Sequence, residues 1–251
     1  VFQRGDALGY PHAAIAKRPE LVNEGQQPWV RFPYFKARSH VFEAMICHAS
    51  ELLPGCMPHM PHSHHLEELL IILDGTATIF SYRSRAGVLQ SIPATAGDFF
   101  YYPRRHAHTL CNAGDGPLRY LMLRWKTRAP ATTGAVPFHY RHAEYASGPE
   151  RFSVERPSSG LKHLHIHHSR LQPRQRFPSH IDQYDTAIVV LDGRLSMLEH
   201  ELGPGGMYYV RAGELHNTRN ESAAACEYVV FEFHPRTPGE TGESGNQLPV
   251  A

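Results

Sequence analysis

Three histidines and one glutamate have the residue types and the spacing of ligands for a transition-metal ion. His62 and His64 alternate along the chain, Glu68 follows with the same parity, and His108 comes from a later segment. Alternate residues of a β-strand face the same side, so the first three side chains are expected to share one interior, where His108 completes the set. Three imidazole nitrogens and one carboxylate leave one or two coordination positions open, which is typical of a catalytic metal site.

Four further residues near these ligands are candidates for catalysis or substrate binding. His59 precedes the ligands in a loop at the expected mouth of the interior, and Tyr101 and Tyr102 are candidate acid/base groups ahead of His108. Arg105 could pair with a substrate carboxylate, because a guanidinium binds carboxylates in a bidentate manner. A plain exposed histidine and a solvated surface arginine remain open as alternatives for His59 and Arg105.

Short apolar runs between glycine and proline turns predict that β-strands position these residues. The chain contains 20 glycines and 20 prolines, which suits many strands and turns better than long helices. Strands are predicted at residues 41–53, 69–81, 98–102, 108–112, 118–125, 161–171, 186–198, 206–211, 216–220 and 226–234.

The second half of the chain repeats the first half. The sequence Leu-Asp-Gly at 73–75 recurs at 191–193, and the spacing from Gly97 to His108 recurs from Gly205 to His216. A repeat of strands separated by turns predicts two similar β-barrels in one chain.

The repeat changes the ligand set. His180 takes the place of the first histidine and Asp182 that of the second, Thr186 replaces the glutamate, and His216 keeps the last position. Two interpretations remain open. In the first, this barrel has lost its metal and serves as a scaffold or dimer surface. In the second, His180, Asp182 and His216 form a second candidate metal site of two histidines and one carboxylate, as in non-haem iron sites. The alternating histidines of residues 163–167 either line this second cavity or face water.

The chain is predicted to divide into five parts. The N-terminal arm and the linker are rich in proline and are expected to be irregular, apart from a short helix near His142–Tyr145. The parts are an N-terminal arm (1–39) that packs on a later domain, a first barrel (40–126), a linker (127–160), a second barrel (161–235) and a mobile tail (236–251).

Composition excludes several classes of partner. The 25 basic and 24 acidic residues give a formal net charge of +1, and no long charged run occurs, so neither nucleic acid nor a membrane is expected as a partner. No apolar run is long enough for a transmembrane helix, and no signal peptide opens the given chain, so a cytoplasmic location is predicted. The chain begins at Val1 and not at methionine, which leaves a removed leader open. The four cysteines form no Cys-X-X-Cys pair and are expected to be reduced and mostly buried.

The ligand pattern resembles the two motifs of the cupin superfamily. Residues 55–75 match the first motif, glycine to His-X-His to glutamate to glycine, with one extra residue before His62. Residues 97–112 match the second motif, except that Arg105 stands in place of its second glycine. The resemblance is strong over 40–126 and weaker over 161–235. It implies an all-β bicupin with two double-stranded β-helix (jelly-roll) barrels, and it implies that His62, His64, Glu68 and His108 bind the metal.

The resemblance leaves the reaction open, because cupins support many chemistries on one fold. The leading hypothesis is a dioxygenase-type oxidoreductase that acts on a small, anionic organic substrate and uses iron, with manganese, zinc, nickel or copper as alternatives. One alternative is a Lewis-acid lyase, isomerase, decarboxylase or hydrolase on the same site. Another is a non-catalytic cupin that binds a small molecule. Association as a homodimer is compatible with the family.

Overall fold

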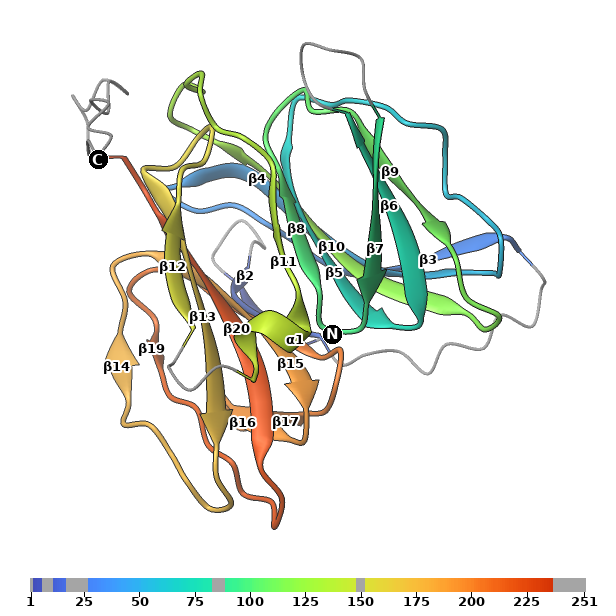
Figure 1. Cartoon of the computed structure of the whole chain (residues 1–251). Helices are drawn as coiled ribbons and strands as arrows, with labels where there is room; N and C mark the ends of the chain where they lie inside the picture. Colours follow the sequence, from blue (N-terminus) through green and yellow to red (C-terminus); the bar gives the residue numbers. More distant parts are fainter. Residues whose placement is uncertain (1, 6–10, 17–26, 83–88, 148–151, 237–251) are drawn as a thin grey trace, which may run out of the picture.

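Nearly every element of the chain is a β-strand, and the strands form two barrels (Figure 1). The computed structural model describes residues 2–5, 11–16, 27–82, 89–147 and 152–236. The all-β architecture of two barrels expected from the sequence is therefore confirmed, and the described residues add one short helix between the barrels.

The first barrel is built from a six-stranded sheet, ordered β11-β8-β5-β10-β4-β3, and a three-stranded sheet, ordered β7-β6-β9. The paired strands of both sheets are antiparallel. Its strands are β3 (Trp29–Ala37), β4 (Phe42–Leu52), β5 (Glu67–Asp74), β6 (Thr76–Tyr82), β7 (Leu89–Thr95), β8 (Phe99–Tyr102), β9 (His108–Asn112), β10 (Leu118–Thr127) and β11 (Phe138–Tyr140).

The second barrel repeats this plan with a seven-stranded sheet, ordered β1-β2-β18-β15-β20-β13-β12, and two short ribbons, β14-β19 and β16-β17. Its strands are β1 (Phe2–Gly5), β2 (Pro11–Ala16), β12 (Ser153–Arg156), β13 (His163–Leu171), β14 (His180–Ile181), β15 (Asp185–Asp192), β16 (Leu195–Met197), β17 (His200–Leu202), β18 (Met207–Val210), β19 (Leu215–His216) and β20 (Cys226–His234).

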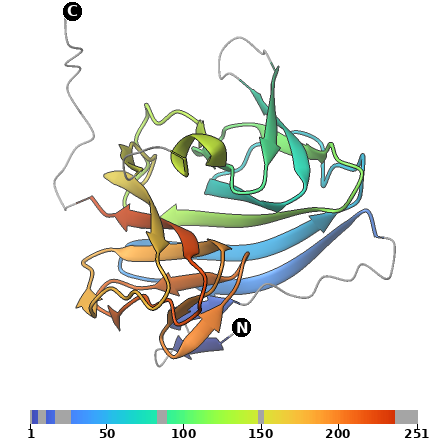
Figure 2. The same ribbon diagram turned by 60° about the horizontal axis from the view of Figure 1, so that its bottom comes forward.

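The alternation of side chains along β5 and β15 assigns them to different cores. Leu70 and Ile72 belong to the core inside the first barrel, and Ile188 belongs to the core inside the second barrel. The intervening Leu69 and Val189 join a third core in which the large sheets of the two barrels pack on each other. Figure 2 shows these sheets lying against each other. Each central strand is therefore buried on both faces, and the parity of a residue decides whether it reaches a barrel interior or the interface.

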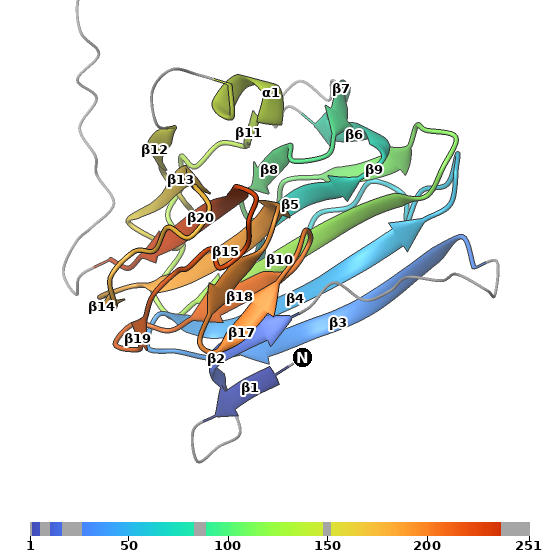
Figure 3. The same ribbon diagram turned by 90° about the horizontal axis from the view of Figure 1, so that it is seen from below.

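The expectation of an irregular N-terminal arm is wrong for its described residues. β2 pairs with β18 of the second barrel, whereas β3 pairs with β4 of the first (Figure 3). Proline suggested irregular chain, but Pro11 is the first residue of its strand, and Pro33 lies beside a register shift in β3, the edge strand of its sheet. Edge strands and strand starts tolerate proline because its missing N–H is not needed there.

The predicted linker is also more ordered than expected. Its β11 extends the first barrel and its β12 extends the second, so it connects both sheets. The short helix expected near His142 is confirmed as α1 (His142–Tyr145). The predicted strands at 69–81 and 186–198 each divide in two, because Gly75 and Gly193 adopt φ of +87° and +71° and turn the chain.

The cysteines are free thiols, with Cys47 and Cys226 buried and Cys56 and Cys111 partly buried. The described residues contain no helix that is long and apolar enough to cross a membrane. Of the predicted mobile tail, residues 237–251 lie outside the described residues.

Helix α1 is tied to the second barrel by an ion pair that makes stability depend on pH. Nε2 of His142 and Nε2 of His168 each lie 2.7 Å from Oε1 of Glu227. The hydrogen bond with Glu227 outweighs burial and raises the pKa of His142 above 6.5. The hydrogen bonds from His142 and His168 lower the pKa of Glu227 below 4.5. Because folding raises the pKa of His142, its positive charge stabilises the fold below pH 6.5, and this contribution is lost as the pH rises through the raised pKa. Because folding lowers the pKa of Glu227, its negative charge stabilises the fold above pH 4.5, and this contribution is lost as the pH falls through the lowered pKa.

We therefore expect wild-type protein to lose stability between about pH 6 and about pH 8, and His142→Gln to remove part of that loss. Urea unfolding at both pH values would measure it, with exposed His40→Gln as the control. An equal pH dependence in wild type and His142→Gln would contradict this assignment.

Candidate metal centres

Glu68 lies at the centre of the predicted ligand set in the first barrel. Its Oε2 is 3.0 Å from Nε2 of His64, and its Oε1 is 3.3 Å from Nε2 of His108. One ligand atom from each of the three residues lies within 4.8 Å of those of the other two. Glu68 and His108 are buried and come from the strands β5 and β9, so the barrel holds them in place.

The remaining ring nitrogens determine how the two histidines face Glu68. Nδ1 of His64 lies 2.9 Å from the carbonyl oxygen of Leu66, and Nδ1 of His108 lies 2.9 Å from that of His106. A carbonyl oxygen only accepts hydrogen bonds, so Nδ1 carries the proton in both rings. In the neutral rings, both Nε2 atoms then direct a lone pair toward the carboxylate. A metal ion among these atoms would satisfy all three groups. Histidines that bind metals in proteins are commonly anchored in this way, with the other ring N–H donated to a backbone carbonyl.

Glu68 is held in its charged form. Burial alone would raise the pKa of Glu68, but the neighbouring rings of His108 and His64 and the Arg124 guanidinium together hold it well below its usual range. Arg124 Nε donates to Oε2 of Glu68 at 2.6 Å from the neighbouring strand β10. Oε1 is therefore the oxygen available to a metal, while Arg124 orients the carboxylate.

His62 stands beside these three ligands. Its ring centroid is 5.5 Å from that of His64 and 6.1 Å from that of His108, and its backbone bridges to His108. Its nitrogens lie outside the group that falls within 4.8 Å. Within the described part of the chain, buried Nδ1 of His62 and buried Nε2 of His108 have no hydrogen-bond partner. Two unpartnered buried nitrogens beside a carboxylate fit a divalent transition-metal ion.

His62, Glu68 and His108 line a small cavity of about 70 Å³ inside the first barrel. Arg31 and Arg124 supply positive charge to its wall, and His48 lies beside them. Leu70, Leu110 and Met122 are among its apolar lining residues. The sequence did not single out the two arginines or His48, because β3, β4 and β10 reach this wall only through long-range pairing. Arg124 alone had a signal, since it shares the parity of the interior residues Tyr120 and Met122.

The other four candidate residues of the first barrel lie in different surroundings in the structure. His59 lines the cavity, and its ring stacks edge-on against His62 with centroids 4.1 Å apart. The Tyr102 ring stacks on His108 with centroids 3.9 Å apart, and burial together with the charge of Glu68 raises the pKa of Tyr102 well above 10. Tyr101 points the other way and donates to Glu67. Arg105 is exposed, adopts φ of +61° where the motif has glycine, and does not line the described cavity.

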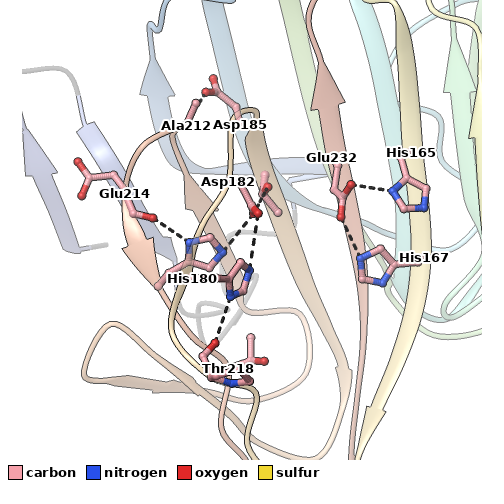
Figure 4. A network of polar contacts seen from close by, with 12 residues as sticks. His165, His167, His180, Asp182, Asp185, Ala212, Glu214, Thr218 and Glu232 are labelled. Atoms are coloured by element: carbon pink, nitrogen blue, oxygen red, sulfur yellow. Dashed lines mark hydrogen bonds and ion pairs between the residues drawn. The ribbon is translucent and has the colours of Figure 1, made fainter.

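The second barrel retains a group of two histidines and one carboxylate. Nε2 of His216 lies 3.4 Å from Oδ2 of Asp182, and Nε2 of His180 lies 3.7 Å from Oδ1 (Figure 4). Nδ1 of each histidine is again paired with a backbone carbonyl, of Glu214 and of Pro178. Thr186, at the position of the missing glutamate, donates to Asp182 at 3.4 Å. His180, Asp182 and His216 could thus hold a metal, with the carboxylate moved to the position of the second histidine.

The cavity of the second barrel is larger, at about 390 Å³. His180, Asp182 and His216 line one wall, and His167 and Glu232 line it from β13 and β20. The alternating histidines of β13 therefore divide. His167 reaches the described cavity, His165 pairs with Glu232, and His163 pairs with Glu155. Asp185 has the opposite parity to Thr186 in β15 and is buried, where it accepts a hydrogen bond from Tyr209.

The profile of the cupin domain matches residues 49–124 and again residues 167–232. The chain belongs to the cupin family. The two matches confirm the duplication and coincide with the barrels that hold the metal-ligand groups. No curated protein matches the sequence of this cupin.

Solved structures similar to this cupin share its two-barrel fold. Protein Ylba from E. coli is 12% identical, with a TM-score of 0.66 over 91% of this chain and 93% of that one. The bacterial pirin YhhW from Escherichia coli in complex with nickel(II) is 13% identical, with a TM-score of 0.60 over 89% of this chain and 100% of that one. Oxalate decarboxylase from Bacillus subtilis, a protein with Mn(II) centres, is 13% identical, with a TM-score of 0.56 over 88% of this chain and 80% of that one.

Proposed function

We propose that this cupin is a metal-dependent oxidoreductase of the dioxygenase type that acts on a small anionic organic substrate in the first barrel. The observation that carries the proposal is the group of His64, Glu68 and His108, of which Glu68 and His108 line a cavity whose wall also contains Arg31 and Arg124. A divalent ion there, with iron as the first candidate, would supply redox and Lewis-acid chemistry. Solved structures of the same fold contain nickel(II) or Mn(II), which supports a transition metal without fixing which one.

The residues of the cavity favour a compact anion as the substrate. A cavity of about 70 Å³ has room for a ligand of a few heavy atoms. Arg31 lies over the Trp29 ring at 5.0 Å, which leaves its guanidinium edge available to a carboxylate. Arg124 already pairs with Glu68, so Arg31 is the stronger candidate for binding a substrate carboxylate.

Oxygen uptake tests the proposal directly. Protein loaded with Fe(II) is incubated with a panel of short keto acids and dicarboxylates, and oxygen consumption and product are measured. We expect uptake that requires both Fe(II) and one of these acids, and that disappears in His64→Ala. Turnover without oxygen in the presence of Mn(II) or Zn(II) would contradict the dioxygenase and favour a Lewis-acid lyase, decarboxylase, isomerase or hydrolase.

Two arginine variants form a matched pair for the substrate. Arg31→Met is expected to raise KM for the anionic substrate about tenfold or more, as loss of a charged hydrogen bond does. Exposed Arg105→Met should leave KM near the wild-type value. The opposite result would place the substrate carboxylate at the barrel mouth beside Arg105.

The larger cavity of the second barrel favours small-molecule binding without catalysis as a second candidate function. At about 390 Å³ it can enclose a larger ligand than the first barrel can. Ligand binding that survives His64→Ala and does not depend on metal would support this candidate.

A further inference from the structure

A cluster of histidines around Glu232 lies outside both sets of motif positions. Oε2 of Glu232 is 2.6 Å from Nδ1 of His165 and 3.1 Å from Nε2 of His234, while Oε1 is 3.2 Å from Nε2 of His167. Figure 4 shows Glu232 between His165 and His167, apart from the group around Asp182. One ligand atom each from His165, Glu232 and His234 lies within 4.8 Å of the others.

We propose that His165, Glu232 and His234 form a further site for a divalent transition-metal ion, on the inner face of β13 and β20. The proposal goes beyond the function assigned to the first barrel and does not depend on it. Two imidazoles and one carboxylate are a ligand set for zinc, nickel, cobalt, copper and iron, whereas magnesium and calcium prefer oxygen ligands alone.

Strand pairing places the three ligands before any metal binds. His165 is the direct partner of Glu232 across β13 and β20, and His163 is the direct partner of His234. Directly opposed residues have Cβ atoms about 5 Å apart, and diagonal neighbours remain within reach of long side chains. His234 lies diagonally across from His165, so two adjacent strands supply the whole group from one face. Both strands are central in the large sheet and are held by pairing on either side.

The distances and the proton positions fit a metal with only a small adjustment. Two ligand atoms about 2.1 Å from one ion lie about 3.0–3.4 Å apart in octahedral or tetrahedral geometry. The 3.1 Å separation at His234 fits this geometry, and the 2.6 Å separation at His165 requires the ring to withdraw slightly. Nε2 of His165 is 2.8 Å from Oγ of Ser153, so that hydroxyl can accept its proton and leave Nδ1 free as a ligand.

A shared metal ion would also compensate the charge of Glu232. The exposed fraction of Glu232 is 12%, so water solvates its carboxylate only in part. One divalent ion held by two neutral rings and the carboxylate would balance this negative charge and accept the imidazole lone pairs that face Glu232.

The test counts bound Zn(II) in a protein whose motif sites are disabled. The background variant combines His108→Gln and His216→Gln, which removes one ligand from each motif group. After chelator treatment and equilibrium dialysis against Zn(II), elemental analysis should find one zinc per chain in the background variant. Adding His234→Gln should remove it. Adding His163→Gln should not, because the His163 ring stacks on His234 with centroids 4.3 Å apart but lies outside the ligand group.

Two outcomes would overturn the proposal. The first is a background variant that is folded, as judged by circular dichroism, and binds no zinc. The second is a His234→Gln variant of this background that still binds one zinc per chain. If the background variant does not fold, crystals of the unaltered protein soaked in Zn(II) decide the question. An anomalous difference peak between Nδ1 of His165 and Nε2 of His234 is then expected, and its absence would rule out the site.

Discussion

Replacing Glu67 with alanine should lower the free energy of unfolding by about 3–5 kcal/mol, one of the largest effects of any single substitution in this chain. Glu67 is fully buried and faces the interface between the barrels, one residue away from Glu68 in the metal group. Its Oε1 accepts from the indole Nε1 of Trp125 at 3.2 Å and from the N–H of Gly160 at 2.9 Å. Its Oε2 accepts from Tyr101 at 2.5 Å and from Ser158 and the N–H of Ser159.

The size of the effect follows from the number of donors that would lose their acceptor. Each buried donor left without a partner costs about 1–3 kcal/mol, and the values do not add fully. Three of the five donors belong to residues 158–160, so Glu67 fixes the end of the linker to the first barrel. The backbone approaches so closely that a Cβ on Gly160 would lie 2.8 Å from Oε1 of Glu67 and 2.0 Å from Oγ1 of Thr127.

The second barrel offers a matched control for this prediction. Asp185 occupies the equivalent position in the repeat, where the described residues supply two donors, Tyr209 at 2.8 Å and the N–H of Ala212 at 3.0 Å. Urea unfolding of metal-free protein should therefore show a smaller loss for Asp185→Ala than for Glu67→Ala, with Glu67→Gln between wild type and Glu67→Ala. If Glu67→Ala lowered the free energy of unfolding no more than Asp185→Ala does, the linker would be held by apolar packing and not by the Glu67 carboxylate.

The contrast between Glu67 and Glu68 shows what the sequence could and could not predict. Glu68 could be identified because the ligands alternate within one short segment, and a period of two places them on one face. Glu67 has the opposite parity, and its partners come from residues 158–160, far along the chain. The repeat did contain a signal, since Glu67 and Tyr101 correspond to Asp185 and Tyr209, and both pairs are hydrogen bonded.

The arginine-containing wall of the cavity could not be predicted from the sequence for a related reason. Arg31 lies in β3, which pairs with β4 at the edge of the sheet, and no local pattern specifies that pairing. Pro33 in the same strand concealed it further, because edge strands accept proline that central strands exclude. The sequence therefore predicted the barrels and the candidate metal-ligand group, whereas the arginine that it singled out, Arg105, lies in an exposed turn.

Replacing His108 with glutamine should weaken metal binding in the first barrel by more than about 100-fold, since loss of an outer hydrogen-bond partner alone weakens metal binding about 10–100-fold. Nε2 of His108 is the buried nitrogen nearest to Oε1 of Glu68, at 3.3 Å, and the Tyr102 ring packs flat against its imidazole. Glutamine approximates the length of the side chain but replaces the ring nitrogen with an amide, which is a poor ligand for nitrogen-preferring ions.

His106 provides the control for packing, because its ring stacks on the same tyrosine at 5.7 Å and is also buried. Its Nε2 is engaged by Oγ of Ser81 at 2.7 Å, so it offers nothing to the metal. Competition with a metal indicator should show near-wild-type affinity for His106→Gln and the large loss for His108→Gln. Equal losses in the two variants would mean that packing around Tyr102, and not coordination by Nε2 of His108, controls binding, and His64 and Glu68 would then have to hold the ion without the later strand.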